Sequence, residues 1–402
     1  MDFLDLRFFC CSEWRMLIRF KKNDGTEYPQ WEEFKLSQLE DNKYLSLNRG
    51  KVIPKTEPKG NYPVYSSSVK NNGLLCCIDK YMFDKELISW SIDGGGNFFY
   101  RPPHKYSITN VSGYIDVIAL NKINCKFLYY ALTTKHAKLH FDYLSKAHPS
   151  VIRDLYLVPI PCLKEQQKIA DFLSTVDQKI EAQRTIVADY EELKKGTMQK
   201  IFNQEIRFKD DDGNEFPEWE NKKFGDILYK VNERNNGQFD KTKWISVAKM
   251  YYQDPEKVTS NNIDTRTYVM RVGDMAFEGH PNSEFLFGRF VVNDIGDGVI
   301  SELFPIYRHK NEYVINYWKY AIQVENIMAR VYSKCIISSG ASSNKISDTD
   351  FLKESIYVPC LEEQKKIADY LSALDRKIEA EKKILADLEE LKKGLLQAIF
   401  NN

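Results

Sequence analysis

Side chains that could do chemistry are scattered along this chain, so each short pattern must be judged by its spacing. Asp93-Gly-Gly-Gly96 is the densest run of glycine, but it lacks the G-x-G-x-x-G spacing and the Lys-Ser/Thr of phosphate-binding loops. It predicts a tight turn between strands, since glycine adopts positive φ easily. His136 and His140 have the i,i+4 spacing of two zinc ligands on a helix, but no third ligand accompanies them. A solvated helix face is therefore the favoured interpretation of this pair.

Patterns typical of DNA-modifying enzymes are equally weak. Pro102-Pro103 is flanked by Arg101 and His104, whereas amino-methyltransferases hold the target amine with Asp/Asn-Pro-Pro-Tyr/Phe. Glu57-Pro-Lys59 fits the loose Glu-x-Lys of many nucleases, but this match is common in a chain with 28% charged residues. A cofactor loop, a carboxylate cluster or an activated nucleophile would be needed for catalysis. We therefore predict no catalytic residue, no metal site and no cofactor in this chain.

Composition indicates a globular protein of two to three domains. The chain has 402 residues, of which 43% are apolar and 13% aromatic, enough to form real cores. Its 57 basic residues equal its 57 acidic residues, so net charge alone does not indicate a nucleic-acid partner. Eight cysteines without a C-x-x-C pair predict reduced thiols in the core. Without a membrane-spanning apolar run or a basic-flanked signal, a cytoplasmic protein that contacts no membrane is expected.

A long segment from the middle of the chain recurs at its end. Residues 162–203 match residues 360–401, with 28 of 42 positions identical. A second repeat opens each half, at residues 19–32 and 207–220, and its Asp-Gly pair predicts a turn. We call these two shorter segments the leaders. Each half of the chain therefore consists of a leader, a variable segment that we call the body, and a helix. The two bodies share almost no sequence.

Each long repeat predicts a helix with a narrow apolar seam. Apolar residues recur at steps of mostly four and three over about five heptads, which indicates a pair of parallel or antiparallel helices rather than one surface helix. Polar Gln183 and Glu381 interrupt the seam and can help to fix its register. The seam residues are Ile169, Leu173, Val176, Ile180 and Val187 in the first copy, and Ile367, Leu371, Leu374, Ile378 and Leu385 in the second.

The variable bodies have the pattern of mixed α/β domains, in which short runs rich in β-branched and aromatic residues alternate with turn signals. Expected strands cover residues 86–92, 113–120, 244–248 and 288–292, and expected helices cover 125–144 and 314–332.

This duplicated architecture resembles the specificity subunit of type I restriction–modification systems. The resemblance rests on the two segments Leu-x-Glu-Gln-x-Lys-Ile-Ala-Asp-Phe/Tyr-Leu-Ser, which follow Val-Pro in each half and lie at residues 163–174 and 361–372. Tyr62-Pro-Val-Tyr-Ser-Ser67 and Ser107-Ile-Thr-Asn110 also resemble segments of the family's target-recognition domains. The resemblance spans residues 19–402, nearly the whole chain.

The resemblance implies an α/β (α+β) fold with two mixed α/β target-recognition domains, separated by two long helices packed as an antiparallel coiled coil with a pseudo-twofold repeat. The domains would be residues 19–160 and 207–358, and the helices would lie in 161–206 and 359–402. It implies a non-catalytic subunit in which each domain reads one half of a bipartite site in double-stranded DNA. Two modification subunits carrying S-adenosylmethionine would methylate adenine N6, and restriction subunits using ATP and Mg would cleave.

Physical reasoning supports such an arrangement. Two identical frames would allow two copies of one partner to dock alike, and two different bodies would allow two different DNA sequences to be read. A helix of ~40 residues is about 60 Å long, more than the ~34 Å of one DNA turn. A change of four residues in helix length should move its end by ~6 Å, close to two base pairs. Helix length should therefore set the spacer rather than the half-sites.

Residues that contact DNA are expected in loops of the bodies. Residues 19–161 carry 20 basic and 14 acidic residues, whereas residues 207–359 carry 20 and 23, so a DNA-binding face in the second body must be local. Lysines interleaved with tyrosines at 43–70 suit phosphate contacts, and polar loop residues suit base edges. The candidates are Lys51, Lys55, Lys70, Asn71, Asn72, Arg101, Lys105, Lys146 and His148 in the first body, and Lys249, Asn282, Ser283, Arg289, Ser342, Ser343, Asn344 and Lys345 in the second.

Two other functions remain open from the sequence. One is a stand-alone DNA methyltransferase or nuclease, which the missing cofactor and metal motifs disfavour. The other is a coiled-coil scaffold without DNA binding, which the zero net charge fits but two large, dissimilar bodies do not. Steep salt dependence of DNA binding would distinguish a specificity subunit from such a scaffold.

Overall fold

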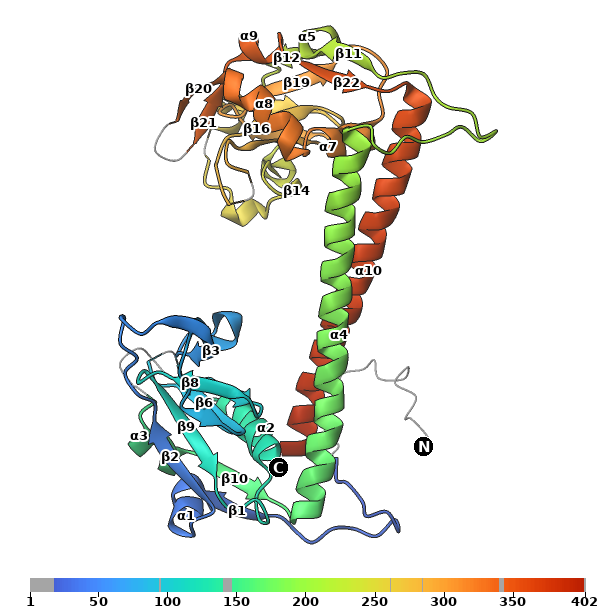
Figure 1. The fold of residues 1–402 in the computed structure, drawn as a ribbon. Helices are drawn as coiled ribbons and strands as arrows, with labels where there is room; N and C mark the ends of the chain where they lie inside the picture. Colours follow the sequence, from blue (N-terminus) through green and yellow to red (C-terminus); the bar gives the residue numbers. More distant parts are fainter. Residues whose placement is uncertain are drawn as a thin grey trace. The chain divides into compact units, whose positions relative to one another are not determined.

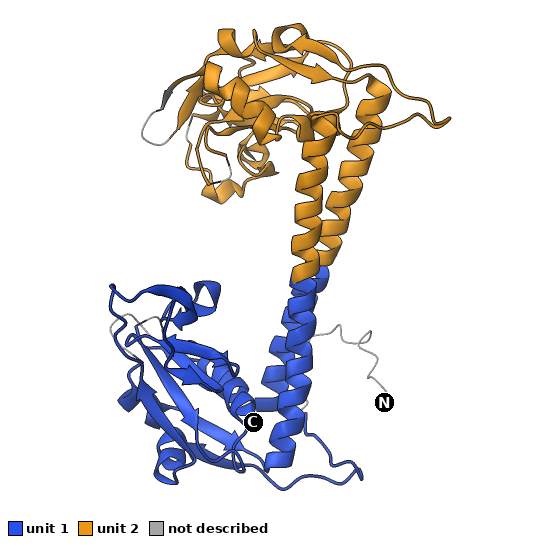
Figure 2. Cartoon of the chain, viewed as in Figure 1, with its two compact units in different colours: residues 1–184, 383–402 blue, residues 185–382 orange. Residues whose placement is uncertain are grey.

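The computed structural model describes residues 18–93, 95–139, 147–260, 262–283, 285–339 and 343–400 (Figure 1). The chain divides into two compact units, residues 1–184 with 383–402 and residues 185–382 (Figure 2). Each unit holds one body together with parts of the two long helices. The units are described one at a time below.

The body of unit 1 is built from ten short strands and three helices within the described residues. In chain order its elements are β1 (Glu32–Lys35), α1 (Leu36–Asp41), β2 (Leu45–Arg49), β3 (Lys59–Tyr65), β4 (Leu74–Ile78), β5 (Phe83–Asp84), β6 (Leu87–Ser91), β7 (Phe98–Arg101), β8 (Lys105–Ile108), β9 (Ser112–Val117), α2 (Cys125–His136), α3 (Pro149–Leu155) and β10 (Leu157–Ile160).

Two four-stranded sheets form this body, in the orders β2-β9-β6-β7 and β4-β3-β8-β5. Every residue of β6 is buried, as expected for an inner strand rich in apolar side chains. Gly113 on β9 lets the ring of Trp90 approach, since a Cβ there would lie 2.0 Å from that ring. β1 pairs with β10, which joins the end of the leader to the strand that precedes the long helix.

The body of unit 2 has the elements β11 (Glu220–Lys223), α5 (Phe224–Ile227), β12 (Leu228–Val231), β13 (Ile245–Ser246), β14 (Tyr251–Tyr252), α6 (Ile263–Arg266), β15 (Thr267–Met270), β16 (Met275–Glu278), β17 (Arg289–Val292), β18 (Gly298–Ser301), β19 (Ile306–His309), α7 (Ile315–Ala321), α8 (Glu325–Cys335), β20 (Ile336–Ser339), β21 (Asn344–Ile346), α9 (Asp348–Phe351) and β22 (Ser355–Val358).

The two bodies share one topology although their sequences do not align. The sheet β12-β19-β16-β17 repeats the order β2-β9-β6-β7, and β11 pairs with β22 as β1 pairs with β10. The hairpin β13–β14 joins β18 through a parallel bridge from Trp244 to Val299, as β3 joins β8 in parallel at Val64 and Ser107. Within the described residues, α8 and the hairpin β20–β21 have no counterpart in the first body.

The long helices are α4 (Leu163–Phe202) and α10 (Leu361–Phe400), each of 40 residues. They are rich in Ala, Leu, Glu, Lys and Gln, which have the highest helix propensities. The first intrahelical hydrogen bonds run from the Gln166 and Gln364 backbone nitrogens to the carbonyls of Cys162 and Cys360. In unit 1, Asp177 and Arg184 of α4 contact Lys392 and Glu389 of α10, so the helices are antiparallel, as the family resemblance implied.

The hydrophobic core of each unit is shared between body and helices. In unit 1, Ile169 and Leu173 of α4 join Ile399 and Phe400 of α10 in one cluster with α2. In unit 2, the equivalent cluster combines Ile367 and Leu371 with Ile201 and Phe202. Each body is therefore packed onto both helices of its unit, and burial of this apolar surface holds them together.

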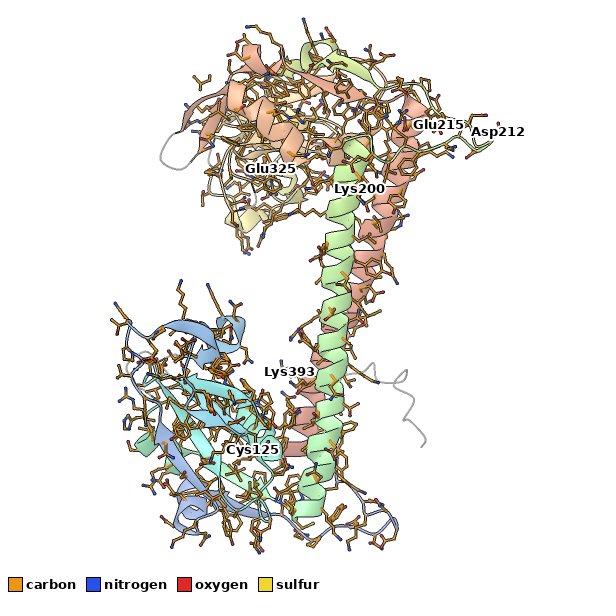
Figure 3. The ribbon with its side chains drawn as sticks, in the orientation of Figure 1. Cys125, Lys200, Asp212, Glu215, Glu325 and Lys393 are labelled. Carbon is orange, nitrogen blue, oxygen red and sulfur yellow. The ribbon has the colours of Figure 1, made fainter. Side chains whose placement is uncertain are left out.

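The mixed α/β fold and the turn expected at residues 93–96 are confirmed for the described residues. Gly95 and Gly96, between β6 and β7, have φ of 86° and 78°. Both Asp-Gly turns in the leaders are present, with φ of 84° at Gly25 and 86° at Gly213. Figure 3 shows Asp212 and Glu215 on the leader of unit 2, which extends from its body.

Two expected helices differ from the structure. The first ends at His136 rather than 144, and His140 lies outside the described residues. The second, expected over 314–332, is broken into α7 and α8 at residues 322–324. Ile322 and Val324 are both buried in the core at this break, and tertiary packing of two short helices outweighs the continuous helical pattern.

The expectation of core thiols is wrong for three cysteines. Cys125, labelled in Figure 3, and Cys335 are buried, but Cys76, Cys77 and Cys162 are exposed. Cys76 and Cys77 lie on β4, an edge strand with most of its side chains exposed, so apolar character alone did not decide their position. All six described cysteines are free thiols. Among the described helices, none is long and apolar enough to cross a membrane.

The buried His309 predicts that the stability of unit 2 depends on pH. Its ring is 7% exposed, stacks 3.8 Å from that of Tyr313, and has no hydrogen-bond partner for either nitrogen among the described residues. Burial lowers its pKa to about 4. Unfolded histidine has a pKa of about 6.5, so between these values only the unfolded chain binds the proton, and stability falls as pH falls.

We expect the free energy of unfolding of unit 2 to decrease between about pH 6.5 and pH 4, and this decrease to be smaller in a His309→Phe variant. Denaturant unfolding at pH 7 and pH 5 would measure both slopes. His148→Phe, at an exposed histidine of unit 1, is the control. Equal slopes for the wild type and His309→Phe would contradict the assignment.

Candidate nucleic-acid interface and the frame that holds it

A buried carboxylate in the first turn of each long helix fastens the leader of the same unit. Glu363 is fully buried and accepts hydrogen bonds from Arg207 Nε at 2.9 Å and Trp219 Nε1 at 2.9 Å. A second Arg207 nitrogen bonds the other carboxylate oxygen at 2.9 Å, which makes the pair bidentate. This hydrogen bonding raises the pKa of Arg207.

The same clamp is present in unit 1 with looser geometry. Glu165 is fully buried and accepts from Arg19 Nε at 3.3 Å and from Trp31 Nε1 at 3.0 Å. The Arg19 side chain is 34% exposed, against 17% for Arg207. The leader repeat and the helix repeat are thus the two halves of one interaction, which explains why both recur in the sequence.

Glutamines beside the clamp join helix and body. Gln166 Nε2 donates to the carbonyls of Pro161 and Lys122 at 2.8 and 2.9 Å, and its Oε1 accepts from the backbone of Asn124. Gln364 Nε2 donates to the carbonyl of Pro359 at 2.9 Å. Both amides are buried, so their hydrogen bonds hold the start of each helix at a fixed place on its body.

Ion pairs between the helices repeat in the two units. In unit 1, Asp177 pairs with Lys392 at 2.6 Å and Arg184 with Glu389 at 2.5 Å. In unit 2, Asp375 pairs with Lys194 at 2.5 Å and Lys382 with Glu191 at 2.9 Å. Each residue of the first set is the repeat counterpart of one in the second, so the same register is specified twice.

A tyrosine of each body reaches the same aspartates. Tyr130 of α2 donates to Asp177 at 2.6 Å, and Tyr320 of α7 donates to Asp375 at 2.7 Å. Burial, with the neighbouring carboxylate, raises the pKa of both tyrosines, so they remain neutral donors. In each unit, one aspartate of a long helix therefore contacts both a tyrosine of the body and a lysine of the facing helix.

The seam residues of the helix repeat are largely buried. Ile180, Val187 and Ile378 are at most 8% exposed, whereas Val176, Leu374 and Leu385 are half-buried. Gln183 and Glu381, which interrupt the seam, are each 8% exposed.

Five of the first body's DNA-contact candidates are exposed basic or amide residues in the β3–β4 connection, at the start of β8 or beside its end. Lys70, Asn71 and Asn72 form the connection between β3 and β4, and Lys51 pairs with Thr109 beside the end of β8. Lys105 begins β8, with its amine 4.9 Å from the centre of the Tyr81 ring.

The remaining candidates of the first body lie elsewhere. Lys55 is exposed in the loop after β2, and His148 is the exposed residue before α3. Arg101 is 1% exposed, with its guanidinium 3.8 Å from the centre of the Tyr65 ring. Lys146 lies outside the described residues.

Candidates of the second body converge at one edge of its sheets. Arg289, at the start of β17, donates to the carbonyl of Ala248 beside Lys249. The backbone nitrogen of Asn344 donates to the carbonyl of Gly279 at 2.8 Å, and its side chain donates to that of Phe287 at 3.2 Å. Three loops from separate parts of the chain are thereby joined.

These loops carry most of the candidates of the second body. The β16–β17 loop holds exposed Asn282 and Ser283, and the β20–β21 hairpin adds Ser343 and exposed Lys345. Ser342 lies outside the described residues. The shared edge explains how a body with excess negative charge could offer a local polar and basic surface.

Sequence reasoning missed the apolar part of the first body's surface. Val69, Leu74 and Leu75 flank the β3–β4 connection and are 59%, 45% and 60% exposed. Apolar side chains can contact thymine methyl groups in the major groove. No sequence pattern distinguishes these residues from core positions, because their exposure follows from β4 being an edge strand. Among the described residues, no three of His, Cys, Asp and Glu cluster as metal ligands would.

Comparison with protein families agrees with this duplicated frame. The model for "Type I restriction modification DNA specificity domain" matches residues 29–189 and 217–390, once in each half and over most of the chain. The chain belongs to this family. Each match to the specificity domain begins near the end of a leader and continues into the helix that follows its body.

Two curated relatives illustrate the range of similarity within the specificity family. The type I restriction enzyme MjaVIII specificity subunit of Methanocaldococcus jannaschii is 24% identical over 415 aligned positions, 95% of each chain. The MpnII specificity subunit of Mycoplasma pneumoniae is 33% identical over 146 positions, 35% of this chain and 43% of its own length. S.MpnORF285P of that organism is 35% identical over 147 positions and is matched over only 47% of its length.

Solved structures show the same fold at low sequence identity. The type I restriction–modification S subunit from M. genitalium has a TM-score of 0.54 at 16% identity, over 96% of this chain and 99% of its own. A chain from a study of complex assembly and conformational transition of the type I system has a TM-score of 0.55 at 15% identity, over 92% and 98%. The specificity-domain fold therefore extends over both bodies and both helices.

Removal of the clamp carboxylate should destabilise its unit strongly. Glu363→Ala would leave Arg207 and Trp219 without their shared acceptor, and breaking a buried pair costs about 3–5 kcal/mol. Glu165→Ala should cost less, because its single arginine contact is longer and more exposed. Denaturant unfolding measures both. Asp369→Ala, an exposed carboxylate of α10, is the control, and a loss no larger than the control's would contradict the clamp.

Proposed function

We propose that this chain is the sequence-reading subunit of a type I restriction–modification complex in the cytoplasm. Residues 19–160 and 207–358 act as two target-recognition domains, and each reads one half of a bipartite, asymmetric site in double-stranded DNA. The helical segments 161–206 and 359–402 separate the domains and dock the partners. The observation that carries this proposal is the pair of matching clamps, which hold bodies of one topology but different surfaces.

The chemistry is assigned to partner subunits. Two modification subunits would bring S-adenosylmethionine and methylate adenine N6, and restriction subunits would bring ATP and Mg for cleavage. The names of the curated relatives, as specificity subunits of type I restriction enzymes, support a non-catalytic role. This chain's own task is to bind the two half-sites and so choose where its partners act.

Two repeated surfaces support the docking of two copies of one partner. Near the start of α4, Phe172 is 38% exposed and contacts Phe20 of the leader, with ring centres 5.6 Å apart. Near the start of α10, Tyr370 is 41% exposed and contacts Phe208 at 5.7 Å. Each aromatic pair joins a long helix to a leader that the clamp fixes, so each unit presents a similar partly apolar surface.

Replacing one exposed aromatic of the docking pair should remove one partner copy. We expect Phe172→Lys or Tyr370→Lys to yield a complex with a single modification subunit, and the double variant to bind none, because a charge at an apolar contact opposes binding. Native mass spectrometry would count the subunits. Leu303→Lys, at a 79% exposed leucine of the second body, is the control. Two bound copies in the double variant would contradict this docking surface.

The function itself is tested by mapping methylation at single-molecule resolution. Cells would express a candidate methyltransferase encoded beside this chain, with and without the chain. We expect N6-methyladenine on both strands of a two-part asymmetric motif only when the chain is present. Methylation without the chain, or methyl transfer by the purified chain alone, would favour an independent enzyme. If the purified chain shows no salt-sensitive DNA binding, a scaffold becomes the better interpretation.

A further inference from the structure

The connection between β3 and β4, residues 66–73, has three successive residues in the left-handed backbone region. Asn71 and Asn72 have φ of 49° and 51°, and Gly73 follows with φ of 80°. A non-glycine residue in this left-handed region costs about 1–2 kcal/mol, although asparagine tolerates it best. Both asparagine side chains are exposed, and neither amide has a hydrogen-bond partner among the described residues. The strained backbone therefore presents two adjacent unused amides to solvent.

Arg101 binds the backbone of this connection. Its Nη1 donates to the carbonyl of Asn72 at 2.8 Å, and its Nε donates to Ser89 Oγ at 2.9 Å. The guanidinium carbon lies 3.8 and 4.9 Å from the centres of the Tyr65 and Phe99 rings. A Cβ at residue 73 would lie 3.0 Å from Nη2, so the contact also favours glycine there.

This arginine is a poor choice for packing alone. It is 1% exposed, has no carboxylate partner among the described residues, and leaves Nη2 without a hydrogen bond. Burial lowers its pKa to about 10, so it stays charged at neutral pH. An uncompensated buried charge is destabilising compared with an apolar side chain of similar size. What the arginine provides in return is the hydrogen bond that fixes the Asn72 carbonyl.

In the equivalent hairpin of the second body, a half-buried arginine also donates to a backbone carbonyl. Residues 247–250 connect β13 and β14, and Met250 has φ of 48°, which is unusual for a methionine. Arg289 donates to the carbonyl of Ala248, lies 4.6 Å from the centre of the Phe285 ring, and leaves Nε without a partner. Exposed Lys249 sits between the pinned carbonyl and the strained residue. Arg101 is the last residue of β7 and Arg289 is the first residue of β17, so the two arginines lie at opposite ends of equivalent strands and reach their hairpins from different positions.

We propose that these two hairpin tips are the base-reading elements of the two bodies, and that Arg101 and Arg289 are positioning residues that hold them without contacting DNA. Asn71, Asn72 and Lys249 are then the specificity-determining side chains. Amides of asparagine suit adenine and the lysine amine suits guanine in the major groove. The two tips differ in length and sequence, as two different half-sites require. This inference rests on the proposed function and assigns its specificity to particular residues.

The test uses the full chain with its modification partner and maps methylated motifs. Arg101→Met should relax one half-site, with discrimination at one or two base positions falling roughly tenfold to hundredfold, as for a lost bidentate pair. Arg289→Met should relax only the other half-site. The double change Asn71→Gly and Asn72→Gly keeps the left-handed backbone accessible but removes both amides. It should relax the same base positions as Arg101→Met.

A control and a second readout separate positioning from general stability. Arg153→Met removes an arginine of the first body that pairs with Glu40 far from the tip in sequence, and it should leave both half-sites unchanged. Hydrogen exchange of residues 66–78 should accelerate in Arg101→Met but not in Arg153→Met. Arg101→Lys should restore part of the discrimination, since lysine can still donate one hydrogen bond.

Several outcomes would overturn the inference. If Arg101→Met leaves its half-site unchanged, the tip is not the reading element of the first body. If it weakens both half-sites equally together with thermal stability, its role is only structural. Either result leaves the two-part motif of the wild type, and with it the proposed function, intact. A wild-type chain that directs no two-part motif overturns the proposed function and this inference together.

Discussion

Each unit depends on the hydrogen bonds of one buried carboxylate, which lies in the first turn of its long helix. A charge removed from water is stable only with good partners, and for Glu363 these are an arginine and a tryptophan of the leader. Release of the leader would leave that buried charge without hydrogen-bond partners. The leader and the long helix that follows the body are therefore held together at one point. Pairing of β11 with β22 closes the body at the same place.

The register between α4 and α10 is specified in the same way in the two units. Asp177 and Asp375 each accept a hydrogen bond from a body tyrosine and pair with a lysine of the facing helix. Single ion pairs at a surface contribute little, but here they are coupled to an apolar seam and to the body core. The repeated residues therefore specify the same helix register in both units.

The bodies show how one topology can carry different surfaces. Inner strands such as β6 and β16 are fully buried and keep the sheet orders alike. The connections between strands differ in length, charge and strain, and the second body adds α8 with the hairpin β20–β21. Because loops contribute little to the core, their residues can change while the frame remains. This separation between frame and loops allows one topology to carry two different surfaces.

Local and repeated features were determined by the sequence alone. The periodic seam and the strong helix formers predicted α4 and α10, and the repeats predicted that the two halves would share a frame. The Asp-Gly turns and the glycine turn at residues 93–96 also followed from short-range preferences. These features depend on neighbours within a few residues, or on identity between the two copies, and both can be observed in the sequence.

Only the tertiary structure decided which residues are buried and which distant loops meet. Arg101 was a candidate DNA contact in the sequence, but in the structure it is buried and bonds the backbone of the β3–β4 connection. Cys76 has the apolar character of a core residue, yet an edge strand leaves it exposed. The edge shared by Lys249, Arg289 and Asn344 joins three loops far apart in the chain. Such placement results from long-range sheet pairing and competition for the core, which no local pattern in one sequence records.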